Sequence, residues 1–249
     1  MSTLQPFHLK AADGKRIRGD RAEGKDRQIL FITGFLSKRW GNKSKALAQW
    51  CEEQDWGFSC YDVRGFGESE GTFADYTLSD WVADARLVVN MIKEGPPITI
   101  VGNSLGSWIA WMMAQEFEQI ERLVLIAPAF NMMGIRARSI SEERRHAWLT
   151  AGWMPWDDDE MHRDFPIAWT WVEESEAYWN KNFDRLRRVK TTILHGLQDT
   201  VILPQGSSQF VEQLLARDPA FPIELNLIPG DHRLSSPEHV ETFHRMVVE

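Results

Sequence analysis

The stretch that decides the fold spans residues 98–113 and reads ITIVGNSLGSWIAWMM. Its first four residues, Ile-Thr-Ile-Val, form a mostly apolar run, as in a buried strand, and residues 108–113 have the composition of a helix. Between them lies the pattern Gly-x-Ser-x-Gly, formed by Gly102, Ser104 and Gly106. The pattern alone is common, but a position between a strand and a helix is what a nucleophilic serine on a sharp turn requires. Glycines avoid steric collision at such a turn, so we expect Ser104 to be a nucleophile flanked by the turn glycines Gly102 and Gly106.

Apolar runs of the same kind recur along the chain, each bounded by Gly, Asp or Pro. They predict buried strands at residues 28–35, 57–63, 98–101, 122–129, 191–195 and 223–228. Helical patterns separate these runs, and short connections between alternating strands and helices favour parallel strands. The predicted fold class is therefore α/β, with a mainly parallel central sheet covered by helices on both faces. A hairpin that turns at Asp13-Gly14 is expected at the edge of this sheet.

Residues 131–190 interrupt the alternation of strands and helices. They contain no strand-like run, but they hold half of the chain's 12 tryptophans, at positions 148, 153, 156, 169, 171 and 179. Aromatic side chains dominate the packing energy of cores, so most of these should pack a helical cap against the body, and the others could line a pocket for an acyl group. We predict a single domain, residues 1–249, with a helical cap inserted at residues 131–190.

A serine hydroxyl becomes a good nucleophile only when a base takes its proton, so a histidine oriented by a carboxylate is needed. Asp199 follows the strand predicted at residues 191–195, and His232 follows the strand predicted at residues 223–228. Both are expected at the carboxyl edge of the sheet, where open α/β sheets place their sites. The chain order Ser104, Asp199, His232 also fits a triad on a strand-turn-helix elbow.

Other histidines and acids compete for these roles. The remaining histidines lie in the hairpin, the cap, a strand and the last helix, where such residues are usually structural or solvated: His8, His146, His162, His195, His239 and His244. Asp231 adjoins His232, but in an extended loop it points elsewhere and holds the ring poorly. Asp199 is therefore the better candidate for the residue that orients the base.

Negative charge that develops on a substrate oxygen must be met by backbone N–H donors. Leu105, directly after the candidate nucleophile, supplies one. Phe35 should supply the second, from a turn in which Gly34 lets the chain fold tightly. The alternative is that Gly34 and Phe35 only end a strand.

Composition excludes several classes of protein. A net charge of -8 argues against nucleic-acid binding, which requires an excess of Lys and Arg. No apolar run approaches the roughly 18 residues of a membrane span, and no signal peptide precedes Lys10, so a cytoplasmic protein is expected. Cys51 and Cys60 should be two reduced thiols. A homodimer is compatible with the sequence.

No cofactor and no metal are expected. Gly65 and Gly67 are not followed by the Gly-Lys-Ser/Thr of a phosphate loop, and the acidic run at residues 157–160 lacks the spacing of a calcium loop. The cysteines and histidines do not have zinc-ligand spacing. We interpret residues 62–69 as a structural loop shaped by glycines and a buried contact between an arginine and a carboxylate.

From the strand at residue 28 to the last helix, the sequence resembles the α/β-hydrolase family. The resemblance rests on Gly34-Phe35, on the loop at residues 62–69, on the turn around Ser104, and on Asp199 and His232. Within that family, the segments Gly34-Phe35-Leu36-Ser37 and Asp231-His232-Arg233 look similar to the mitochondrial acyl-protein thioesterases and acyl-glucuronide esterases.

Both the residues Ser104, Asp199 and His232 and the resemblance imply a serine hydrolase that cleaves a small-molecule carboxylic ester through an acyl-enzyme. The Trp and Met content of residues 131–190 favours an apolar acyl group. One alternative is an acyl thioesterase that uses the same Ser104, Asp199 and His232, with Phe35 and Leu105 as the oxyanion hole. A second alternative is a non-catalytic ligand-binding protein with the same fold.

Overall fold

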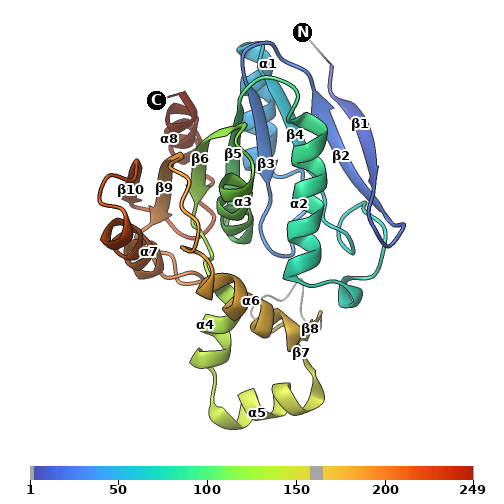
Figure 1. Ribbon diagram of the computed structural model, residues 1–249, viewed down its shortest axis with the longest axis vertical. Coiled ribbons are helices and arrows are strands. Elements are labelled where there is room, and N and C mark those ends of the chain that lie inside the picture. The colour runs from blue at the N-terminus through green and yellow to red at the C-terminus, as the bar shows by residue number, and fades with distance from the viewer. Residues whose placement is uncertain (1–2, 158–164, 249) are drawn as a thin grey trace.

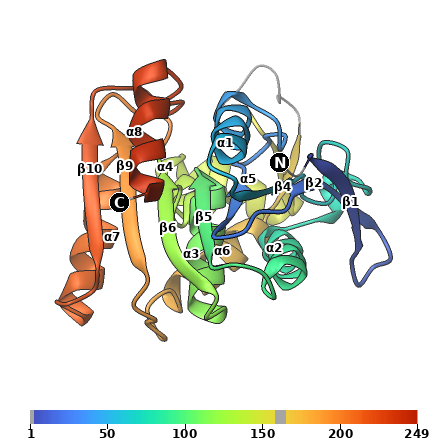
Figure 2. The same ribbon diagram turned by 90° about the horizontal axis from the view of Figure 1, so that it is seen from above.

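The computed structural model describes residues 3–157 and 165–248. These residues build an eight-stranded sheet in the order β1-β2-β4-β3-β5-β6-β9-β10, with helices on both of its faces (Figures 1 and 2). Its strands are β1 (Gln5–Lys10), β2 (Arg16–Ala22), β3 (Gln28–Ile32), β4 (Gly57–Tyr61), β5 (Ile98–Asn103), β6 (Ile120–Ile126), β9 (Lys190–Gly196) and β10 (Ile223–Ile228).

Six neighbouring strands of the sheet are parallel to one another: β4, β3, β5, β6, β9 and β10. The hairpin β1–β2 joins them through an antiparallel pairing of β2 with β4. Each of these strands coincides with one of the predicted apolar runs, and the hairpin lies at the sheet edge as expected. The mainly parallel sheet therefore follows from the short connections between its strands and helices.

Two groups of helices cover the sheet, and Figure 2 shows them on opposite sides. One face packs against α1 (Asn42–Glu53) and α8 (Pro237–Val248), and the other against α2 (Leu78–Ile92), α3 (Leu105–Glu116) and α7 (Gln205–Arg217). Strand side chains alternate between the two cores. Ile29 and Phe31 of β3 contact the first group, while Leu30 and Ile32 contact the second. This alternation is the period of two of a strand buried on both faces.

The helices and strands of the cap segment lie close to one another, beyond one end of the sheet (Figure 1). It contains α4 (Met132–Ser139), α5 (Glu142–Ala151), the strands β7 (Trp153–Pro155) and β8 (Pro166–Ala168), and α6 (Thr170–Asn180). The expectation of no strand here was wrong, because β7 and β8 form an antiparallel hairpin. Strands of three residues are too short to produce a recognisable alternation in sequence.

Most cap tryptophans contribute to packing, as expected. Trp148, Trp156 and Trp171 are buried, whereas Trp153 is 53% exposed. Glu174 of α6 accepts hydrogen bonds from Thr77 Oγ1 (3.0 Å) and from the Ser79 amide (2.8 Å) at the start of α2. The cap is therefore tied to the body by polar contacts as well as by aromatic packing. A short 3-10 helix, Phe73–Asp75, lies beside it.

Residues 62–69 form a loop held by two buried arginines. Asp62 accepts hydrogen bonds from the Arg39 amide (2.6 Å) and from the Arg39 guanidinium. Arg64 donates through Nε to Asp84 of α2 at 2.6 Å. Gly67 has φ +62, and a Cβ there would lie 2.2 Å from the Asp62 carboxyl carbon. The structural interpretation of this loop is confirmed, with carboxylate partners on both the loop and α2.

Both cysteines are buried and form no disulfide. Burial raises the pKa of the Cys51 thiol to about 12 and that of the Cys60 thiol above its ordinary range. They are two reduced thiols that fill the core, as expected.

None of the helices in residues 3–157 and 165–248 is long and apolar enough to cross a membrane.

The buried pair Arg64–Asp84 should contribute much more to stability than an exposed pair. Burial raises the pKa of Asp84 to about 6, although Arg64 opposes the rise. We expect Asp84→Ala to lower the free energy of unfolding at neutral pH by about 3 kcal/mol, because it leaves a buried guanidinium with fewer partners. The control Glu116→Ala removes the exposed partner of Arg86 and should cost less than about 1 kcal/mol. Denaturant unfolding measures both, and equal losses would contradict the prediction.

Candidate active site

Ser104 stands between β5 and α3 in a backbone conformation that side chains rarely adopt, with φ 54 and ψ -120. The Ser104 amide donates to Ile126 O (2.8 Å), and Ser104 O accepts from the Ala129 amide (3.1 Å). A Cβ at Gly106 would lie 2.2 Å from the Ile32 carbonyl oxygen, and one at Gly102 would lie 2.5 Å from Ser107 Cα. The glycines thus permit the close approach of backbones that the sharp turn at Ser104 requires.

The structure brings the three residues predicted as nucleophile, base and acid into one chain of contacts. Nε2 of His232 lies 3.2 Å from Ser104 Oγ, and Nδ1 of the same ring lies 2.7 Å from Asp199 Oδ2. Asp199 follows β9 and His232 follows β10, which are adjacent parallel strands. Ser104 follows β5 at the same edge, because the carboxyl ends of parallel strands meet there.

The carboxylate of Asp199 is held by donors on both oxygens. Oδ1 accepts from the amides of Val201 (2.9 Å) and Ile202 (2.8 Å), and Oδ2 accepts from the His232 ring. Burial opposes ionisation, but hydrogen bonds from His195 and His232 outweigh it and hold the pKa of Asp199 well below its ordinary value. Asp199 is therefore ionised at neutral pH. Since His232 donates through Nδ1 to this carboxylate, its Nε2 is free to accept the proton of Ser104.

The amides of Phe35 and Leu105 stay the predicted donors to an oxyanion, and both residues belong to segments beside Ser104. Leu105 is the first residue of α3, where an amide has no acceptor within the helix. Phe35 follows Gly34, at which a Cβ would lie 3.1 Å from Ser104 Cβ. Within the described residues, neither amide donates a hydrogen bond to the protein. Both can therefore serve a bound oxygen.

The Phe35 ring joins the cap to the site. Its centroid lies 5.1 Å from that of Trp156 and 5.3 Å from that of Trp171, both in the cap segment. Phe73 and Trp81 of the body complete the aromatic cluster at 5.9 Å and 5.7 Å. The position of the cap is thus linked directly to the turn that carries the Phe35 amide.

Most competing residues lie elsewhere or have other partners. His8 and His146 are exposed, His239 contacts Pro229 O (2.8 Å), and His244 stacks on Trp50. His162 lies outside the described residues, as do most of residues 157–160; Asp157 itself pairs with Arg136 and Arg144. Asp231 Oδ1 accepts from the amides of Arg233 and Leu234 and does not hold the His232 ring.

The sequence interpretation missed one residue of this constellation, His195. Its Nε2 lies 3.1 Å from Asp199 Oδ2, so it binds the same oxygen as His232. The sequence does offer one indication of this contact: His195 lies near the end of the strand that precedes Asp199, four residues before that aspartate. The contact forms only once the loop after β9 has folded back, so the strand pattern alone does not reveal it.

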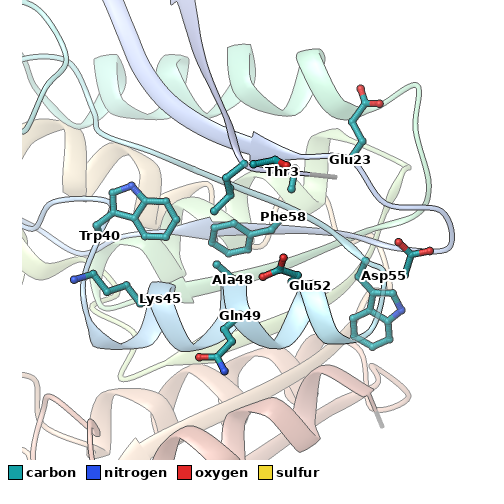
Figure 3. A pocket seen from close by; sticks show the side chains of 12 residues that line it. Thr3, Glu23, Trp40, Lys45, Ala48, Gln49, Glu52, Asp55 and Phe58 are labelled. Carbon is teal, nitrogen blue, oxygen red and sulfur yellow. The ribbon is translucent and has the colours of Figure 1, made fainter. Parts of the chain in front are cut away.

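A cavity of about 340 Å³ lies between α1 and the strands β2 and β4, away from this constellation (Figure 3). Trp40, Trp56 and Phe58 form part of its wall. None of the residues around Ser104 lines it, and one of its three acidic residues, Asp55, is paired with Lys25 at 2.9 Å. The cavity and the constellation around Ser104 are therefore separate. In the described part of the chain, no group of three or more His, Cys, Asp or Glu is arranged to hold a metal ion.

Comparison with known proteins identifies relatives over most of the chain. The family model described as serine aminopeptidase, S33, matches residues 25–183, a stretch that includes Ser104. The mouse protein named palmitoyl-protein thioesterase ABHD10, mitochondrial, is 26% identical over 216 residues, which cover 86% of this chain and 71% of the relative.

Two solved structures have the same arrangement of elements. The mouse α/β-hydrolase domain-containing protein 10 matches with a TM-score of 0.85 and 24% identity, over 98% of this chain and 97% of that protein. A structure from Agrobacterium vitis S4 matches with a TM-score of 0.86 and 23% identity, over 99% and 100%. These likenesses show the α/β-hydrolase fold, which confirms the expected fold class.

The close backbone contact at Gly106 yields a test of the turn. Gly106→Ala should lower the free energy of unfolding by about 1–3 kcal/mol, because its Cβ would collide with the carbonyl oxygens of Ile32 and Thr33. Gly206→Ala is the matched control, since a Cβ at this helical position meets nothing within 4 Å. The control should raise stability by about 0.5–1 kcal/mol. Thermal unfolding distinguishes the two, and an equally tolerated Gly106→Ala would contradict the geometry.

Proposed function

The chain belongs to the family described as serine aminopeptidase, S33, and we propose that it hydrolyses carboxylic esters or thioesters through an acyl-enzyme on Ser104. The observation that carries this proposal is the chain of contacts from Ser104 Oγ to His232 Nε2 (3.2 Å) and from His232 Nδ1 to Asp199 (2.7 Å). This arrangement is a catalytic triad in which Asp199 orients the base and stabilises the imidazolium.

Acylation is the first half of the reaction. As Ser104 Oγ bonds to the acyl carbon, His232 Nε2 takes the hydroxyl proton, and the amides of Phe35 and Leu105 stabilise the negative oxygen. The bond from the acyl carbon to the leaving oxygen or sulfur then breaks. His232 returns the proton to the departing alcohol or thiol, which leaves the acyl group on Ser104.

Deacylation repeats these roles with water. His232 takes a proton from a water molecule as its oxygen bonds to the acyl carbon, and the proton passes to Ser104 Oγ as the acyl–serine bond breaks. A carboxylic acid and free Ser104 result. No step requires a cofactor or a metal ion, because backbone amides supply the electrostatic stabilisation.

An apolar acyl group is the proposed substrate class. The aromatic cluster of Phe35, Trp156 and Trp171 adjoins the turn that faces Ser104. The name of the mouse relative, a palmitoyl-protein thioesterase, supports both a long acyl chain and a thioester. The proposal therefore includes thioesters beside oxygen esters.

Cytoplasmic location and a homodimer stay predictions, which cell fractionation and sedimentation would test.

Ser104→Ala should fold normally and lose nearly all turnover of a p-nitrophenyl ester. Removing a triad serine typically costs about a millionfold in kcat. A fluorophosphonate probe should label the wild-type protein and not this variant. Ser107→Ala is the matched control, because the Ser107 hydroxyl already donates to backbone carbonyls, at 2.8 Å from Gly102 O, and the variant should still be labelled. Full activity in Ser104→Ala would overturn the proposal, and an unlabelled wild-type protein would favour a non-catalytic binding role.

Acyl-chain length tests the substrate class. We expect kcat/KM for p-nitrophenyl esters to rise from acetyl to longer acyl groups, by up to about fourfold for each methylene that leaves water. Trp156→Ala should weaken this preference by removing one wall of the aromatic cluster. A flat profile would contradict the proposed apolar acyl group. Matched ester and thioester substrates of one acyl group then measure which leaving atom is preferred.

A further inference from the structure

His195 is a fully buried histidine near the end of β9, and all of its polar contacts are defined. Its Nε2 lies 3.1 Å from Asp199 Oδ2 and 2.9 Å from the carbonyl oxygen of Ile202. Its Nδ1 lies 2.7 Å from the hydroxyl of Ser207 in α7. Both His195 and Ser207 have 0% exposure. A buried polar ring with this many partners is fixed in orientation.

The partners determine which nitrogen of His195 carries the proton. Asp199 Oδ2 is a carboxylate oxygen and Ile202 O is a carbonyl oxygen, so both can only accept. Nε2 must therefore be the donor, since a bare nitrogen facing two acceptors would be repelled by both. Ser207 can either accept or donate, so its hydroxyl adapts to Nδ1. In the neutral ring, Ser207 donates its proton to Nδ1.

Because His195 Nε2 is a donor, one carboxylate oxygen of Asp199 accepts hydrogen bonds from two histidines. Oδ2 of Asp199 accepts from His232 at 2.7 Å and from His195 at 3.1 Å. The other oxygen is saturated by the amides of Val201 and Ile202. His195 thus has two effects: it prevents rotation of the carboxylate away from His232, and it draws part of the negative charge of Oδ2 toward itself.

We propose that His195 is a positioning residue of the triad, which holds Asp199 Oδ2 toward His232 and limits the negative charge that this oxygen presents to the His232 ring. The inference rests on the proposed function, because it assigns His195 a role through Asp199 and His232. His195 touches neither Ser104 nor the oxyanion donors, so it acts only through the carboxylate. Without the contact to His195, Oδ2 would present more of its negative charge to the His232 ring.

Other charged groups lie near His232 and could contribute to the pH profile of kcat/KM. Asp231 and Arg233 adjoin it in the loop after β10, and Lys43 of α1 interacts with both. Burial lowers the pKa of Lys43 to about 8, with Asp231 opposing and Arg233 adding to this effect. Lys43 therefore titrates on the alkaline side. The acid limb of kcat/KM, which lies away from the titration of Lys43, is the informative one.

Two substitutions of His195 separate its two nitrogens. In His195→Gln the side-chain amide nitrogen takes the place of Nε2 and can still donate to Asp199. In His195→Asn the amide nitrogen takes the place of Nδ1, so it reaches Ser207 and not Asp199. Both variants are polar and place an amide in the buried site: His195→Gln loses the contact with Ser207, and His195→Asn loses those with Asp199 and Ile202, so the two variants form a pair. Rates are normalised to the sites that a fluorophosphonate probe labels, so that unfolded protein does not contribute.

We expect His195→Asn to move the midpoint of the acid limb upward by about half a unit to one unit, because Oδ2 then stabilises the charged His232 ring more strongly. Its plateau kcat should fall about tenfold, the loss expected for one hydrogen bond to a charged group, while KM stays within about twofold. His195→Gln should restore the wild-type midpoint and most of kcat. A merely structural role would lower the number of active sites equally in both variants without moving the midpoint.

An unchanged midpoint in labelled His195→Asn, or the same shift in both variants, would overturn the inference. A measurement on the wild-type protein covers the case in which neither variant folds. Long-range ¹H–¹⁵N spectra of the histidine-labelled protein should show His195 protonated at Nε2, and a proton on Nδ1 alone would overturn the inference as well. Full activity in Ser104→Ala would instead overturn the proposed function, and this inference with it.

Discussion

The strained backbone at Ser104 is the constraint on which the rest of the site depends. A positive φ at a residue with a side chain costs energy, and it persists only where the surroundings leave no alternative. Here the carbonyl oxygens of Ile32 and Thr33, at and just after the end of β3, lie against Gly106, and Ile126 O at the end of β6 accepts a hydrogen bond from the Ser104 amide. Three adjacent strands therefore hold the Ser104 turn in place. The helix that begins at this turn leaves the Leu105 amide without an acceptor in the helix.

Phe35 connects the body of the protein to its cap. Its amide is one of the two donors beside Ser104, while its ring packs against Trp156 and Trp171. A shift of the cap would be transmitted to Phe35 through these rings, because packed aromatic side chains are not easily compressed. The cap thus packs directly against the turn that lies beside Ser104.

Besides the pair Arg64–Asp84, two buried charged groups, Arg39 and Asp199, each have several partners. Arg39 is 6% exposed and pairs with Asp20, Asp62 and Glu68 near the start of the loop at residues 62–69. Asp199 is 3% exposed and accepts from two amides and two rings. The partners of these two groups have different effects. The contacts of Arg39 shape the loop at residues 62–69, whereas the contacts of Asp199 hold its negative charge toward the His232 ring.

The sequence by itself determined the order of the strands along the chain, the strand-turn-helix around Ser104, and the expectation that Asp199 and His232 would share an edge with it. Apolar periodicity, turn glycines and positions at strand ends are local, so they can be read without a structure. Only the tertiary structure decided that His195 shares the carboxylate with His232, that β7 and β8 pair within the cap, and that Phe35 meets two cap tryptophans. Each of these contacts depends on how a loop or the cap folds back onto the sheet, and packing between distant segments leaves no periodic trace in the chain.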